Sequence, residues 1–158
     1  MKYLVFTAAL LIGIAQVQAQ NLGPDYKTAI GMKVFPAALS AKHFVQENRA
    51  VEGLLYMWDY GSRLTALYQI YGDIRTVEGM KWYIGGGAHL GYMNDKWVKD
   101  NPGKAGGVSL GVDGVLGMDY KIKGAPVNIS FDWQPSFNFV GGNYFEAGWG
   151  GLGIRYAF

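Results

Sequence analysis

Apolar residues recur at every second position along most of this chain, and no other feature constrains its fold as strongly. Near the end of the chain, Leu152, Ile154, Tyr156 and Phe158 share one face of an extended segment, and only glycine, arginine and alanine lie between them. Successive side chains of a β-strand point to opposite faces, so a period of two predicts strands. The 24 glycines agree with this interpretation, because a glycine inside a helix costs about 1 kcal/mol.

The pattern returns eight times, and turn-forming residues separate the repeats. The segment 50–59 is the least regular, because it is apolar on both faces apart from Glu52, and its place in the series decides its assignment. We expect a single all-β domain, an eight-stranded antiparallel β-barrel. Its strands are predicted near residues 26–35, 38–46, 50–59, 62–72, 80–93, 106–122, 126–137 and 147–158.

The first nineteen residues have the composition of a secretory signal. Lys2 supplies the positive start, residues 4–15 are mainly apolar, and Val17 and Ala19 are small residues at the positions that a signal peptidase reads. The apolar stretch is about twelve residues long, whereas a membrane-spanning helix needs about twenty. We therefore expect residues 1–19 to be a cleaved signal peptide for Sec-type export, and residues 20–158 to form the barrel.

Composition excludes several kinds of function. The chain has no cysteine, so disulfides, thiolate metal sites and a lipoprotein anchor are excluded. A net charge of +2 without a basic run gives no support to nucleic-acid binding. The two histidines show no metal-ligand spacing. The glycines at 85–87 lack the Lys-Ser/Thr of a phosphate loop, and close strand packing explains them better. We therefore expect no cofactor or metal.

Alternation alone does not say which face points into the barrel. A soluble barrel is apolar inside, whereas a membrane barrel is apolar outside and polar inside. The less apolar face of this chain is rich in glycine and small polar residues, which suit a narrow lumen. Aromatic residues also gather near the predicted strand ends, as in the aromatic girdles of membrane barrels. These are Trp58, Tyr60, Trp82, Tyr83, Tyr92, Trp97, Tyr120, Trp133, Trp149, Tyr156 and Phe158.

The last eight residues resemble the C-terminal assembly signal of bacterial outer-membrane barrels, because Phe158 is terminal and Ile154 and Tyr156 precede it at alternate positions. The number of strands and the chain length resemble those of eight-stranded barrels such as OmpX and the membrane domain of OmpA. The segments 83–89, 111–114 and 129–135 are similar to small outer-membrane proteins of the Bacteroidetes type.

This resemblance implies a transmembrane barrel in the outer membrane, with membrane lipid and the barrel-assembly machinery as partners. Both termini would lie in the periplasm, so the connections near residues 36, 60, 94–107 and 138–146 would face outside. The longest connection would then be external, as in the family. The resembling proteins have no single agreed activity, so the resemblance implies location and fold rather than chemistry.

An eight-stranded lumen is just wide enough for side chains to fill. Both signs of charge occur on the expected inner face, and buried charges persist only when they are paired. We therefore predict a plugged polar lumen rather than an ion path. The network is expected to contain Lys33, Lys42, Glu52, Arg63, His89, Asp113, Asp119, Lys121, Asp132 and Arg155.

Two histidines raise the question of catalysis. His89 is expected in the lumen near Asp113 or Asp132, where it is more simply a hydrogen-bonded interior residue than a general base, because no motif supplies a nucleophile. Some outer-membrane barrels that modify lipid A use a histidine and a serine. Here Ser40 and His43 are three positions apart and point to opposite faces, which disfavours a dyad.

Three functions remain open from the sequence. The first is a non-enzymatic barrel, structural or binding through its external loops, with Trp97, Lys99 and Lys104 as the expected contact residues in the segment 94–107. The second is a lipid A-modifying enzyme. The third is a soluble periplasmic carrier similar to the lipocalins, which requires polar residues on the outside. The sequence does not identify a ligand.

Overall fold

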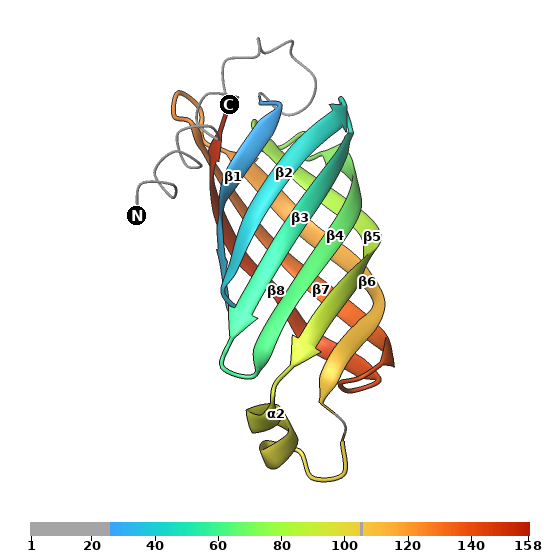
Figure 1. Cartoon of the computed structure of the whole chain (residues 1–158). Coiled ribbons are helices and arrows are strands. Elements are labelled where there is room, and N and C mark those ends of the chain that lie inside the picture. The colour runs from blue at the N-terminus through green and yellow to red at the C-terminus, as the bar shows by residue number, and fades with distance from the viewer. Residues whose placement is uncertain (1–25, 105) are drawn as a thin grey trace, which may run out of the picture.

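The computed structural model describes residues 26–104 and 106–158, which form a closed barrel of eight antiparallel strands (Figure 1). Each strand pairs with the next along the chain, and β8 pairs back to β1. This confirms the predicted all-β class, number of strands and antiparallel order. The predicted signal peptide, residues 1–19, lies outside the described residues. The strands are β1 Thr28–Val34, β2 Ala38–Gln46, β3 Arg49–Trp58, β4 Gly61–Asp73, β5 Met80–Met93, β6 Gly107–Lys121, β7 Val127–Val140 and β8 Phe145–Ala157.

The barrel has two distinct ends. The backbone N–H of Thr28 donates to the carbonyl of Phe158 at 2.8 Å, so β1 begins beside the C-terminus, and we call this the terminal end. The connections after β1, β3, β5 and β7 lie at the opposite end, which we call the loop end (Figure 1).

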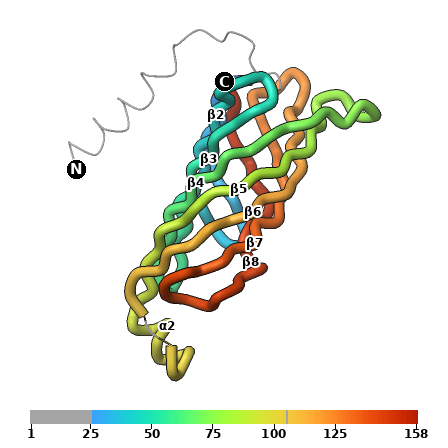
Figure 2. The backbone as a smooth tube through the Cα atoms, turned by 90° about the vertical axis from the view of Figure 1, so that its right-hand side faces the viewer, coloured from blue at the N-terminus to red at the C-terminus, as the bar shows by residue number. Residues whose placement is uncertain are grey.

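One short helix, which the sequence analysis did not predict, stands at the loop end. Helix α2 (Asp95–Asp100) follows β5 and lies beyond the strand ends (Figure 2). It begins at Asn94, whose side chain accepts a hydrogen bond from the backbone N–H of Trp97 at 3.2 Å. Asparagine is a favoured residue at this capping position. No helix in the described part of the chain is long and apolar enough to cross a membrane.

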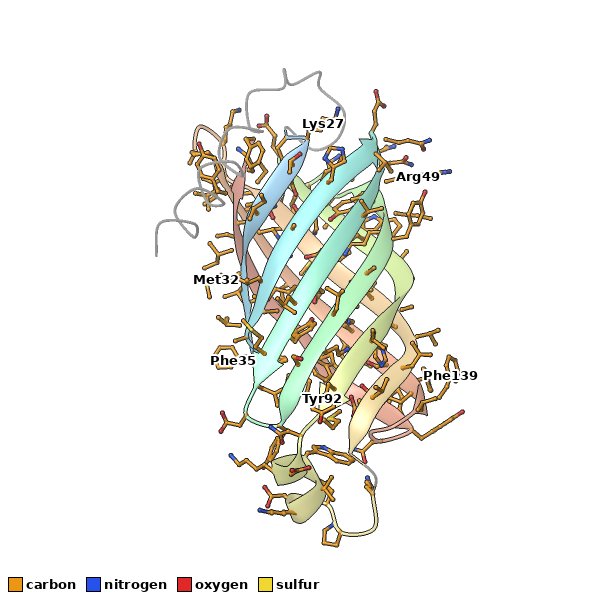
Figure 3. The ribbon with its side chains drawn as sticks, in the orientation of Figure 1. Lys27, Met32, Phe35, Arg49, Tyr92 and Phe139 are labelled. Carbon is orange, nitrogen blue, oxygen red and sulfur yellow. The ribbon has the colours of Figure 1, made fainter. Side chains whose placement is uncertain are left out.

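Alternation along the strands divides the side chains between a polar interior and an apolar exterior. Lys33, Glu52 and Arg155 are at most 1% exposed, whereas Met32 and Ile154 are more than half exposed. Figure 3 shows Met32 and Phe139 projecting from the barrel wall, while the charged Lys27 and Arg49 lie at the terminal end. The barrel is therefore inverted in polarity compared with an ordinary soluble protein.

The prediction of an outward-facing aromatic girdle is wrong for four of its residues. Tyr83 and Trp97 are buried, and Trp58 and Trp149 pack against the interior cluster of apolar residues. Trp58 lies an even number of positions from Glu52, so the alternation of β3 directs both side chains inward. The expected girdle residues that are exposed on the outside are Trp82, Tyr92, Trp133, Tyr156 and Phe158.

Glycine allows neighbouring strands to approach closely at particular points. A methyl group added to Gly87 of β5 would collide with the backbone carbonyl of Ala66 on β4, whereas a methyl group on Gly53 of β3 would meet no atom within 4 Å. The interior glycines of β5 therefore have a steric role, and Gly53 does not.

We predict that Gly87→Ala destabilises the folded barrel by about 1–3 kcal/mol, because the backbone of β4 must move to accept the new methyl group. The control, Gly53→Ala, should be neutral or stabilising by up to about 1 kcal/mol. Urea unfolding of both variants in detergent micelles measures the difference. Equal destabilisation by the two substitutions would contradict this steric interpretation.

Candidate functional site

Polar and charged side chains from all eight strands fill the lumen. In the described part of the chain, no buried side-chain nitrogen or oxygen lacks a hydrogen-bond partner. Such complete pairing is what allows charges to remain inside a narrow barrel. The structure brings nine of the ten expected network residues into the lumen: Lys33, Lys42, Glu52, Arg63, His89, Asp113, Asp119, Asp132 and Arg155.

The central layer of the lumen is built around Arg155 of β8. Its guanidinium forms an ion pair with Glu52 of β3. Strands β1 and β2 lie between β8 and β3 in the barrel wall. The same guanidinium donates to the hydroxyl oxygens of Ser40 and Ser130, each at 2.7 Å. Glu52 also accepts a hydrogen bond from the Gln69 side chain at 2.6 Å. These contacts connect strands β2, β3, β4, β7 and β8 across the lumen.

Two lysines extend this network around the barrel. Lys42 of β2 lies 3.2 Å from a carboxylate oxygen of Asp119 on β6, and its ammonium is 4.6 Å from the centre of the Tyr83 ring. Lys33 of β1 donates to Asp132 of β7 at 2.7 Å. The Tyr83 hydroxyl donates to the same Asp132 at 2.5 Å. Each lysine therefore has a carboxylate partner on a strand that is not its sequence neighbour.

A second polar layer lies nearer the loop end. The Arg63 guanidinium pairs with Asp113, which also accepts from the Ser136 hydroxyl at 3.0 Å. His89 Nδ1 is 2.9 Å from Asp113, as the sequence predicted for one of two aspartates, and its Nε2 is 2.7 Å from the Asn138 side-chain oxygen. Both ring nitrogens of His89 thus have hydrogen-bond partners inside the barrel, where the side chain is buried.

Lys121 differs from the other predicted network residues. It is the last residue of β6, at the terminal end, and it is only half-buried. Its ammonium donates to the backbone carbonyls of Ile122 at 3.2 Å and Ala125 at 2.6 Å. The strand ends before this side chain can reach the acids in the lumen, so Lys121 stabilises the β6–β7 turn instead.

Sequence reasoning missed the uncharged members of the network. The Tyr71 hydroxyl accepts from Lys42 at 2.7 Å, and the Tyr56 hydroxyl donates to Gln134 at 3.0 Å. Both tyrosines lie at an even separation from a charged inner residue of the same strand, Arg63 for Tyr71 and Glu52 for Tyr56. Alternation was the signal that would have placed these tyrosines in the lumen.

The loop end contains a cavity of about 710 Å³, which we call the vestibule. Its walls come from several connections that are distant in the sequence. Five aromatic rings contribute to the lining: Phe35, Trp58, Tyr60, Trp97 and Trp149. The polar side chains of the lining are Asp100, Asn101, Asn143 and Glu146.

Trp149 joins the vestibule to the lumen network. Its ring centre is 5.2 Å from that of Trp58, and its indole N–H donates to Glu146 at 2.6 Å. The Arg63 guanidinium carbon lies 4.1 Å from the Trp149 ring centre, and Arg63 is also 3.6 Å from Glu146. The paired charges of the lumen therefore hold Trp149 and Glu146 in place.

The expected loop contacts are only partly accessible. Lys99 and Lys104 are exposed, whereas Trp97 is buried on the inner side of α2, where its ring lines the vestibule. The Tyr60 hydroxyl donates to the Asp100 carboxylate at 2.9 Å. This hydrogen bond raises the pKa of the Tyr60 phenol, which stays protonated as the donor.

The structure does not bring Ser40 and His43 together. The Ser40 hydroxyl lies in the lumen, where it donates to Glu52 at 2.7 Å. His43 lies on the outer face of β2, 2.8 Å from the Thr28 hydroxyl and near the terminal end. Among the described residues, no group of three or more acidic or histidine side chains is placed to hold a metal ion.

Comparison with known proteins identifies no relative. No protein-family model matches the chain, and no curated protein or solved structure matches it significantly.

We predict that Glu52→Gln destabilises the barrel by about 3–5 kcal/mol, because it leaves the buried Arg155 charge without its carboxylate partner. The matched control is Lys123→Gln, which breaks an exposed ion pair with Glu78 and should change stability by less than about 1 kcal/mol. Urea unfolding in detergent measures both. A similar small effect of the two substitutions would show that the central ion pair is not required.

Proposed function

We propose that this chain is a non-enzymatic bacterial outer-membrane barrel, with a lumen closed by its own side chains and a loop end that binds a ligand. The observation that carries the proposal is the inverted polarity of the barrel. Its interior buries lysines, arginines and acids in a paired network, and its exterior exposes leucine, isoleucine, valine and aromatic rings. Water is a poor solvent for such an exterior, whereas lipid is a good one.

The distribution of exposed charge supports the same location. Glu47, Arg75 and Glu78 belong to turns at the terminal end, whereas Asp59 and Lys96 belong to connections at the loop end. The wall between them exposes apolar residues at alternate positions. Lipid also offers no partners to backbone N–H and C=O groups, and a closed sheet supplies these partners itself.

The C-terminal residues support recognition by the barrel-assembly machinery. Ile154 and Tyr156 are more than half exposed, and Phe158 is 38% exposed on the same outer face. These side chains are therefore available to a partner, although they belong to the closing strand. Together with the C-terminal resemblance, this exposure supports insertion into the outer membrane as the end of export.

The closed lumen favours binding over transport. The Arg155–Glu52 pair and the Arg63–Asp113 pair cross the lumen at two levels, and each is buried. A continuous water path would have to break both. With both termini in the periplasm, the vestibule would open on the external side of the membrane and be accessible to ligands.

The two alternatives have less support. A lipid A-modifying enzyme needs catalytic side chains that converge near the outer leaflet, whereas Ser40 is inside the lumen and His43 is outside at the other end of the barrel. A lipocalin-like carrier needs an apolar interior for its ligand, whereas this interior holds paired charges.

Electrophoresis in cold detergent tests the proposed architecture. We expect the mature protein to fractionate with the outer membrane, to remain folded in detergent, and to change mobility after boiling. In a planar bilayer it should give no steady channel conductance, since the lumen is filled. A periplasmic protein without a heat-dependent shift would contradict the proposal, and a stable open channel would contradict the closed lumen.

A charge placed on the outer wall distinguishes a membrane barrel from a soluble one. Val112 lies within the outer wall of β6, and Val77 lies in the β4–β5 turn; both are about two-fifths exposed. We predict that Val112→Lys destabilises the barrel in lipid vesicles by about 2–4 kcal/mol, as expected near the centre of the bilayer. Val77→Lys, the control, should change stability by no more than about 0.5 kcal/mol.

Reversible urea unfolding from vesicles provides the measurement. Similar small effects of the two lysines would indicate that the wall around Val112 faces water.

A further inference from the structure

The vestibule has the size of a small-molecule site. Its volume of about 710 Å³ lies within the range of about 300–1,000 Å³ that ligand pockets usually have. Trp58 comes from the end of β3, Trp97 from α2 and Trp149 from β8. Three separate elements thus present indole rings to one space, with Tyr60 beside them.

The charge around this space is negative. Asp100 and Glu146 are the charged side chains of its described lining, and both are acids. Below them, Arg63 is shared between Asp113 and Glu146, so one guanidinium faces two carboxylates. A cleft with low-dielectric walls concentrates such a potential and attracts ions of the opposite sign. An anionic ligand is disfavoured here, and a cation is favoured.

The barrel already places its own cations on these rings. The Arg63 guanidinium lies 4.1 Å from the centre of the Trp149 ring, and the Lys96 ammonium lies 5.2 Å from the centre of the Tyr60 ring. The faces of aromatic rings attract cations through their quadrupole, and tryptophan does so most strongly. Lys96 also pairs with Asp59, at 3.2 Å.

We infer that the vestibule binds a small organic cation, an ammonium that carries apolar groups. The apolar groups would contact the indole rings of Trp58, Trp97 and Trp149, and the positive centre would lie between the rings and the acids. Aromatic cages recognise quaternary ammonium groups by the same combination of forces. This inference rests on the proposed binding role of the loop end and names the chemical class of its ligand.

A pair of isosteric probes tests the inference. Choline carries a quaternary ammonium, and 3,3-dimethyl-1-butanol has the same shape without the charge. The folded protein is titrated with each probe in a polyoxyethylene detergent, which carries neither charge nor sugar, and tryptophan fluorescence is recorded. Three of the five tryptophans line the vestibule and report on it directly. We expect choline to bind about fivefold or more tightly than the neutral isostere.

Two variants locate the site. Asp100→Asn removes one charge of the lining and should weaken choline binding about two- to fivefold. The matched control is Glu78→Gln, which removes an exposed carboxylate that pairs with Lys123 at the terminal end of the barrel, and it should leave choline binding unchanged. Asp100 is exposed, so its substitution should leave the fold intact, and the shift in mobility on boiling verifies this.

Equal affinity for choline and the isostere, or no response to choline, overturns the inference when the barrel is still heat-modifiable. Maltose, titrated in the same way, is a neutral sugar probe. If maltose changes the fluorescence and choline does not, the inference is overturned and the vestibule is a sugar site. A chain that lacks the heat-dependent shift overturns the proposed function, and the inference with it.

Discussion

The buried ion pair between Arg155 and Glu52 is the interaction on which the rest of the structure depends. It joins the last strand to the third across the lumen, at a level where Ser40, Ser130 and Gln69 also converge. A barrel with an apolar outer wall has its polar side chains inside, where each charge needs a partner. The pairs of Arg155, Lys42 and Lys33 satisfy that requirement and fill the space that a pore would need.

The same network supports the loop end. Arg63 connects Asp113 in the lumen with Glu146 and Trp149 in the vestibule. The Trp149 ring of the vestibule is therefore held against the second polar layer of the lumen, although it belongs to the loop end. A binding surface that is held in this way loses little conformational freedom on binding, because its side chains are already ordered. The lumen network therefore fixes the position of side chains in the vestibule wall.

The alternation of apolar and polar residues predicted most of the fold. The wrong girdle residues of the strands and the unpredicted lumen tyrosines are positions where aromatic character was weighed above alternation. The eight strands, the position of Lys33, Glu52 and Arg155 on the polar faces of their strands and the proximity of His89 to one aspartate agree with a period of two. The girdle prediction for Trp149 follows from its aromatic character alone, whereas its position two residues from Gly151 of β8 predicts the inner face. Helix α2 was missed because its six residues are too few for a helical period to show.

The sequence by itself determined that the chain forms strands, where each strand turns and which side chains share a face, because these properties depend on neighbours along the chain. Only the tertiary structure decided that the polar face is the interior, since alternation is symmetric between the two faces. It also decided the partners: Arg155 meets Glu52, and Trp58 meets Trp149, across about a hundred positions of sequence. Those contacts depend on strand register and on closure of the barrel, which join residues that no local pattern relates.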